Sequence, residues 1–304
     1  DDFDAVADQT VSVTTTDDDV AGFTIVESDG STEVAESGTT DTFTIVLDAQ
    51  PTSDVVLTVT SSDTGEATVT SSLTFTPANW DTPQTITITG VDDDIIDGTV
   101  TSTITISVVD ASSNDNFDAV ADQTVSATTA DDDVAGFTIV ESNGSTEVAE
   151  SGTTDTVTVV LDAEPNSDVV ISISSDDTGE ATVNGPLTFT SANWDTPQTV
   201  AVSGADESII DGDQTSTITI SIDDANSDDG FDSVANQTVS VTTTDDDVAG
   251  FTIVESDGST SVDESGTTDT FTIVLDAEPS SNVVVAMSSS DTGEATLSGT
   301  ITFT

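Results

Sequence analysis

The feature that most constrains this chain is an internal repeat. The string Thr-Thr-Thr-Asp-Asp-Asp-Val-Ala-Gly-Phe-Thr-Ile-Val-Glu-Ser starts at Thr14 and returns nearly unchanged at Thr128 and Thr242, 114 residues later each time. This period is the size of one small domain, so the chain is an array rather than one large domain. Cutting after each acidic triplet predicts four segments: the C-terminal strand of a preceding repeat at 1–19, complete repeats at 20–133 and 134–247, and an incomplete repeat at 248–304.

Short runs of alternating apolar and polar residues fill the first complete repeat. They lie at 23–26, 42–47, 55–60, 73–76, 84–89, 103–109 and 123–129, rich in β-branched residues and separated by Gly, Asp, Asn, Ser and Pro. Such runs predict strands, and seven of them in one repeat are typical of a sandwich. We therefore expect an all-β fold of tandem immunoglobulin-like antiparallel β-sandwiches, about seven strands each. Only Asp131 to Gly136 separates the repeats, which predicts an extended array.

The charge balance excludes several classes of function. The chain has 60 Asp plus Glu, no Lys, Arg or His, and a formal net charge of -60. Nucleic acid and anionic membrane surfaces are therefore excluded as partners, whereas divalent cations are favoured. Without His, Cys, Lys, Arg or Tyr the chain lacks the usual catalytic bases and nucleophiles, so we expect no enzyme; a carboxylate dyad of the glycosidase type is the enzymatic alternative. No apolar run is long enough for a membrane span in this window.

Four acidic elements recur in each repeat. In the first they are Glu36, Asp63, the stretch Asp92 to Asp97 and the triplet Asp131 to Asp133. Ca2+ takes about six to eight oxygen ligands, more than one loop supplies, so several loops have to converge. In an up-and-down order of strands, the loops after the first, third and fifth strands would share one pole with the end of the seventh. The pattern therefore predicts a Ca2+ site at that pole.

These motifs resemble a known family. Gly90-Val-Asp-Asp-Asp-Ile-Ile-Asp97, the later Asp-Asp-Asp-Val-Ala-Gly and the stretch Leu73 to Ile86 look like the Calx-beta repeat of sodium/calcium exchangers and long bacterial surface proteins. The resemblance covers essentially the whole chain and implies a cluster of Ca2+ at the junction with the next domain. Carried over by motif, the implied ligands of the first repeat are Glu36, Asp63, Asp92, Asp93, Asp97, Asp131, Asp132 and Asp133. Those of the second are Glu150, Asp177, Asp206, Glu207, Asp211, Asp245, Asp246 and Asp247, and a third triplet is Asp17, Asp18 and Asp19, without upstream partners in this window.

The second repeat departs from the first at one point in this pattern. Glu207 and Ser208 stand where the first repeat has Asp93 and Asp94. Glu keeps the charge but moves the oxygen, so we expect the second site to hold fewer ions or to bind them more weakly.

The function that these features favour is structural. We expect an extracellular or cell-surface spacer or fibre-forming array in which Ca2+ at the junctions stiffens the chain, with neighbouring repeats as its partners. Two alternatives stay open: an adhesin module that binds glycan or a partner protein, and a subunit that packs laterally with identical chains in a filament. The copies differ mainly by isolated substitutions, which favours the structural role over variable binding loops.

Overall fold

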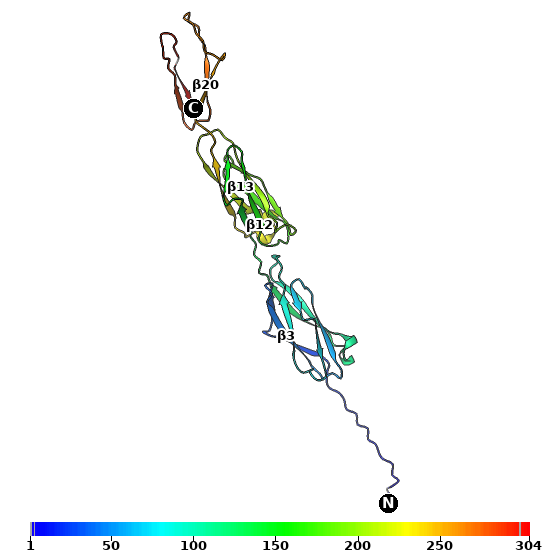
Figure 1. Cartoon of the computed structure of the whole chain (residues 1–304). Coiled ribbons are helices and arrows are strands. Elements are labelled where there is room, and N and C mark those ends of the chain that lie inside the picture. The colour runs from blue at the N-terminus through cyan, green and yellow to red at the C-terminus, as the bar shows by residue number, and fades with distance from the viewer. Residues whose placement is uncertain (1, 3, 298) are drawn as a thin grey trace. The chain divides into compact units, whose positions relative to one another are not determined.

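The computed structural model describes residues 2, 4–297 and 299–304. It divides into two compact units, Asp1–Asp133 and Val134–Thr304 (Figure 1). The described residues contain no helix long and apolar enough to cross a membrane.

Unit 1 is a sandwich of two sheets. One has the order β1 (Phe23–Glu27), β3 (Thr40–Leu47), β7 (Gln84–Gly90) and β5 (Ala67–Val69). The other has the order β2 (Thr32–Ala35), β9 (Gln123–Ala130), β8 (Val100–Val108), β4 (Val55–Ser61) and β6 (Ser72–Phe75). Two short 3-10 helices, η1 (Asp110–Ser112) and η2 (Asp115–Phe117), connect β8 to β9. The predicted all-β sandwich is confirmed.

Alternation along the strands builds the core of unit 1. In β3 the side chains of Phe43, Ile45 and Leu47 are buried, while the residues between them are half-buried on the outer face. Period-two patterning of this kind places one face of each strand against the facing sheet. Phe75 and Phe117 are also almost fully buried, and each such side chain contributes roughly 1.5 to 3 kcal/mol by leaving water.

The topology differs from the expected up-and-down order. The sequence order of the strands is interleaved in both sheets, so β7 lies between β3 and β5. Two strands were not predicted, β2 and β5, and β2 pairs with β9 in parallel, with Thr32 opposite Ala127 and Ala35 opposite Ala130. The expected meander was wrong because the strands from β1 to β8 alternate between the two sheets, and only β8 and β9 are consecutive strands that pair with each other.

The residues that precede β1 carry no strand in their described part. Gln9 to Thr16 has the same sequence as β18 (Gln237–Thr244) but is exposed along its length. In unit 2 that sequence pairs with two neighbouring strands, whereas an isolated segment has no backbone partners to hold it extended. The strand predicted at 1–19 also includes Asp1 and Phe3, which lie outside the described residues.

Unit 2 repeats this sandwich between residues 137 and 244. Its first sheet has the order β10 (Phe137–Glu141), β12 (Thr154–Leu161), β16 (Gln198–Gly204) and β14 (Ala181–Val183). Its second has the order β11 (Thr146–Ala149), β18, β17 (Gln214–Ile222), β13 (Val169–Ser175) and β15 (Leu187–Phe189), with η3 (Asp224–Asn226) and η4 (Asp229–Phe231) before β18. The register is conserved as well, since Phe137 faces Leu161 as Phe23 faces Leu47.

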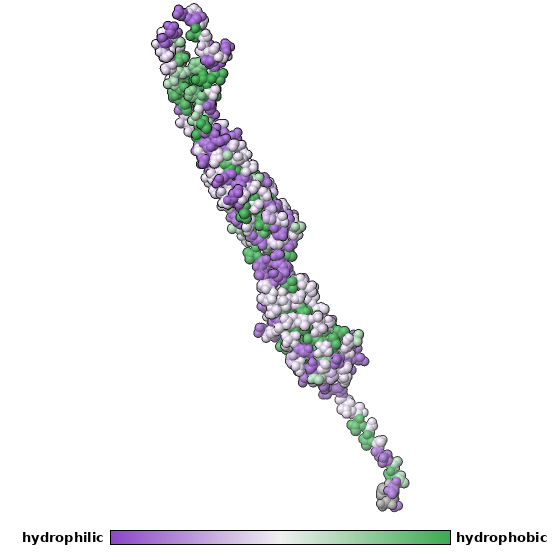
Figure 2. Space-filling view, viewed as in Figure 1, coloured by the Kyte–Doolittle hydropathy of each residue, from purple (hydrophilic) through white to green (hydrophobic). Residues whose placement is uncertain are grey.

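The last part of unit 2 forms two separate strand pairs. β19 (Phe251–Glu255) pairs with β20 (Phe271–Leu275), and β21 (Val283–Ala286) pairs with β22 (Thr300–Phe303). Phe251 is 52% exposed, whereas Phe23 is 2% exposed at the same place in its repeat. Figure 2 accordingly shows apolar residues on the surface of this part.

Candidate metal centre

Backbone hydrogen bonds bring four chain segments together at one end of unit 1. The N–H of Glu36, just after β2, donates to the carbonyl of Ala130 at the end of β9, 3.1 Å away. At the end of β7, Gly90 donates to Thr39 (3.0 Å) and Val91 donates to Glu66 (2.9 Å). The predicted convergence of the acidic elements therefore occurs, although through a different strand order from the one expected.

Glu36 lies at the centre of this end. Its side chain is 0% exposed, and neither carboxylate oxygen has a hydrogen-bond partner. Burial, followed by the negative charges of Asp131 and Asp93, raises the pKa of Glu36 to about 7. A carboxylate that loses water and gains no donor is costly, so this position favours a bound proton or a bound cation.

Glu36 belongs to two groups of carboxylates at once. In the first, which we call the loop group, one oxygen from each of Glu36, Glu66 and Asp97 lies within 4.8 Å of the others. In the second, the triplet group, Glu36 meets Asp93 and Asp133 within the same distance. Because Glu36 has two oxygens, it can bridge two ion positions.

Glu66 is a member of the loop group that the sequence analysis did not select. It is 7% exposed, one of its oxygens is buried without a partner, and burial and Asp97 raise its pKa. The ligand that the sequence predicts in the motif Asp-Thr-Gly-Glu-Ala-Thr is Asp63. In the structure Asp63 accepts the N–H of Gly65 at 3.0 Å and so closes the turn that presents Glu66. The recurrence of the Glu with the Asp, at Glu180 and Glu294, was the available signal.

The consecutive acids do not all face the site. Asp92 and Asp132 are exposed, whereas Asp93, Asp131 and Asp133 are half-buried. Successive side chains of an extended segment point to opposite sides, so a run of acids presents alternate members. Asp131 accepts the N–H of Gly98 at 2.8 Å and that of Asp133 at 2.7 Å, which fixes the loop before β8 against the end of β9.

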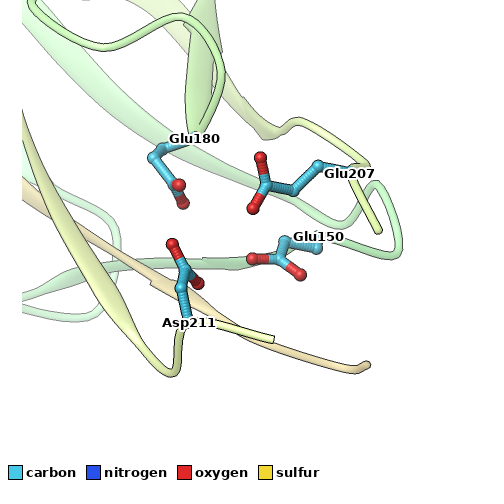
Figure 3. A group of neighbouring side chains, drawn as sticks. All are labelled: Glu150, Glu180, Glu207 and Asp211. Carbon is cyan, nitrogen blue, oxygen red and sulfur yellow. The ribbon is translucent and has the colours of Figure 1, made fainter. Parts of the chain in front are cut away.

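The second repeat builds a corresponding centre within unit 2. Glu150 is 0% exposed with both oxygens buried and unpartnered, and burial, followed by the charge of Asp245, raises its pKa to about 7. The nearby backbone N–H of Asp246 lowers the pKa of Glu150 in part, although it is not a hydrogen-bond partner of either oxygen. The loop group here has four members, Glu150, Glu180, Glu207 and Asp211, whose carboxylates point toward one another (Figure 3). The triplet group consists of Glu150, Asp245 and Asp247.

The other predicted ligands of unit 2 take supporting or exposed positions. Asp177 accepts the N–H of Gly179 at 2.9 Å, as Asp63 does in unit 1, and Asp206 and Asp246 are exposed. Asp245 also accepts the N–H of Gly212 at 2.8 Å.

The first triplet, Asp17 to Asp19, is exposed along its length, with Asp19 N–H donating to Asp17 at 3.1 Å. Within the described residues, it joins no group of close carboxylates.

The donor set of both centres suits a hard divalent cation. Every grouped side chain offers carboxylate oxygen, the ligand type that Ca2+ prefers, and the chain has no Lys, Arg or His to neutralise it. Glu36 and Glu150 are both buried and without hydrogen-bond partners, so no described group of the chain offsets their charge when they are ionised.

Comparison with known proteins gives resemblances of fold only. No protein-family model and no curated protein matches the chain. Among solved structures, CBD12 from CALX1.2 is 13% identical, over 72% of this chain and 99% of that one, with a TM-score of 0.30. The calcium binding domain CBD12 of CALX1.1 is 15% identical, over 65% of this chain and 79% of that one, with a TM-score of 0.27. Domains 4 and 5 of the S-layer protein SbsC are 15% identical, over 74% of this chain and 99% of that one, with a TM-score of 0.29.

At such identities and TM-scores, ligand and role have to come from the chain's own residues.

Proposed function

We propose that the carboxylate centre of each complete repeat binds Ca2+, and that the chain is a structural spacer of an extracellular protein whose joints are stiffened by that Ca2+. One observation carries the proposal: Glu36 and Glu150 are fully buried, and all four of their carboxylate oxygens lack a hydrogen-bond partner. Such a group is stable only when neutralised.

Protonation alone does not supply that neutralisation at neutral pH. A pKa of about 7 leaves each of these Glu residues about half ionised at pH 7, while Asp93, Glu66 and their neighbours add further negative charge. A divalent cation neutralises several carboxylates together, and Ca2+ accepts the flexible oxygen shell that four separate loops provide.

Stiffening of the joints follows from where the ligands lie in the sequence. The triplet Asp131 to Asp133 is followed directly by Val134 to Gly136, and β10 begins at Phe137. An ion held by Asp133 would restrain the residues that enter the next repeat and would remove repulsion between adjacent carboxylates. An extracellular setting, where Ca2+ is abundant, suits modules that bind it with Kd on the order of 0.1 to 1 mM.

The test uses the full chain stripped of metal and titrated with Ca2+ in a calorimeter, with Mg2+ as the control ion. We expect saturable Ca2+ binding, and an increase in free energy of unfolding of about 2.7 kcal/mol per site when Ca2+ is at 100 times its Kd. Small-angle scattering with Ca2+ and with EDTA measures the stiffening separately. Equal melting temperatures and scattering curves in both conditions would contradict the proposal.

A further inference from the structure

The two repeats distribute their carboxylates differently. Asp93 joins Glu36 and Asp133 in the triplet group, but Glu207, at the same place in the second repeat, joins the loop group. The loop group therefore has three carboxylates in unit 1 and four in unit 2 (Figure 3). In the triplet group of unit 2, Asp245 accompanies Asp247, so that group keeps three members.

The different side-chain lengths of Asp93 and Glu207 explain why the two residues join different groups. One oxygen of Asp93 accepts the N–H of Ile95 at 2.8 Å, which holds this short side chain close to its own backbone. Glu207 is one methylene longer and reaches the carboxylates of Glu180 and Asp211; its Oε1 is buried without a partner. Glu180, 8% exposed, also directs an unpartnered oxygen into this group. Two independent side chains thus offer free oxygens to one position.

We infer that the residue at one equivalent position, Asp93 in the first repeat and Glu207 in the second (position 93/207), decides how the carboxylates of a repeat are shared between its loop group and its triplet group. As a result, Ca2+ fills the loop group of unit 2 before either group of unit 1. The inference rests on the proposed Ca2+ function. A fourth carboxylate adds both a ligand and a negative charge, and Ca2+ affinity in oxygen sites rises with the number of charged ligands. This order is the reverse of the weaker second site expected from the sequence.

Two glycine amides report on the two centres separately. Gly98 donates its N–H to Asp131 and Gly212 donates to Asp245, each at 2.8 Å, and each glycine directly follows a member of the loop group of its own repeat, Asp97 or Asp211. Their NMR signals can be followed in the full chain while Ca2+ is added. We expect the Gly212 signal to change at a Ca2+ concentration at least about tenfold below that for Gly98, because of the additional charged ligand.

Reciprocal substitutions test the assignment of position 93/207. Glu207→Asp should remove the difference between the two midpoints, and Asp93→Glu should lower the Gly98 midpoint toward that of Gly212. Asp94→Glu adds the same methylene at an exposed neighbour and should change neither midpoint. Coincident midpoints in the unchanged chain, or midpoints that neither substitution moves, would overturn the inference while leaving Ca2+ binding intact. A chain that takes up no Ca2+ in the calorimeter would overturn the proposed function itself.

Discussion

Gly90 lies directly against the backbone of Ala35. A Cβ built on Gly90 would stand 2.0 Å from the carbonyl oxygen of Ala35, a distance that no side chain tolerates. Gly204 and Ala149 repeat this contact at 2.0 Å in unit 2. Since Ala35 precedes Glu36, and Gly90 leads into the loop of Asp93, the close approach sets how near these two carboxylates come.

Gly90→Ala should therefore damage both the fold and the metal centre. The methyl group meets backbone atoms that cannot rotate away, so we expect a loss of about 3 kcal/mol in the free energy of unfolding of unit 1 and weaker Ca2+ binding. Trp80 packs against the core of unit 1, so its fluorescence in a Trp194→Phe background follows unfolding of that unit alone.

Gly30→Ala is the matched control for the Gly90 change. Gly30 has φ +87° but nothing within 4 Å of its added Cβ, so only the backbone conformation opposes the substitution, at about 1 kcal/mol. Equal losses for the two variants would show that the contact with Ala35 is not tight.

Glu36→Gln should stabilise the metal-free unit 1 but weaken its Ca2+ binding. Without metal at pH 7.5, removing a buried charge surrounded by other carboxylates should raise the melting temperature of unit 1. With Ca2+, the stabilisation of this unit should largely disappear, because both carboxylate groups lose their shared member. Thermal unfolding with EDTA and with Ca2+ measures both effects. Glu33→Gln, an exposed change on β2, the strand that leads to Glu36, should leave the response to Ca2+ unchanged. A normal response in Glu36→Gln would refute the bridging role.

The stability of the metal-free protein should fall as the pH rises. Glu36 and Glu150 have folded-state pKa values of about 7 against 4.5 as the ordinary value, so the folded chain holds more protons between these limits. Stability from these groups is fully present below about pH 4.5 and is lost as the pH approaches and passes 7. Calorimetric melting of metal-stripped protein should give a higher melting temperature at pH 5 than at pH 8, and a reversed or flat trend would contradict the buried position of these two carboxyls.

Glu66→Gln should weaken Ca2+ binding more than Asp63→Asn. Glu66 offers a buried, unpartnered oxygen to the loop group, whereas Asp63 accepts the Gly65 N–H, which an Asn carbonyl can also accept. Losing a ligand from a three-carboxylate group should lower affinity roughly tenfold or more. Calorimetric titration of the two variants with Ca2+ compares their affinities directly. A larger loss of Ca2+ affinity in Asp63→Asn would show that Asp63, the residue expected from the sequence, is the ligand.

The long strands of the sandwich could be predicted because their pattern is strong. The expected strand at 84–89 matches β7 (Gln84–Gly90) within one residue, since isoleucine alternates with threonine there. β2 and β5 have four and three residues, too few for a period to emerge, and their positions depend on tertiary pairing. The parallel pairing of β2 with β9 joins residues almost a whole repeat apart, and no local pattern encodes it.

The acidic centre could be predicted as a region but not residue by residue. Glu36, Asp93, Asp97 and Asp133 were all expected; Asp93 and Asp133 lie close to Glu36 in the triplet group, and Asp97 lies close to Glu36 in the loop group. Which members of an acidic run face inward depends on the register of the extended chain, so Asp92 and Asp132 could not be told from their neighbours. Glu66 was missed because its importance comes from its burial, which depends on segments far along the sequence: Val91 N–H and the Thr129 hydroxyl both donate to the Glu66 carbonyl.

The parallel pairing of β2 with β9 also has a mechanical consequence. A pull on the two ends of unit 1 draws β2 toward its start and β9 toward its end, so the strands are loaded in opposite senses along their length. The hydrogen bonds that join Thr32–Ala35 to Ala127–Ala130, together with the one from Glu36 to Ala130, must then yield in shear, all at once rather than one after another. Bonds broken together resist a pull more strongly than bonds broken one by one, so we expect this pair to be the main barrier to unfolding of unit 1 under tension.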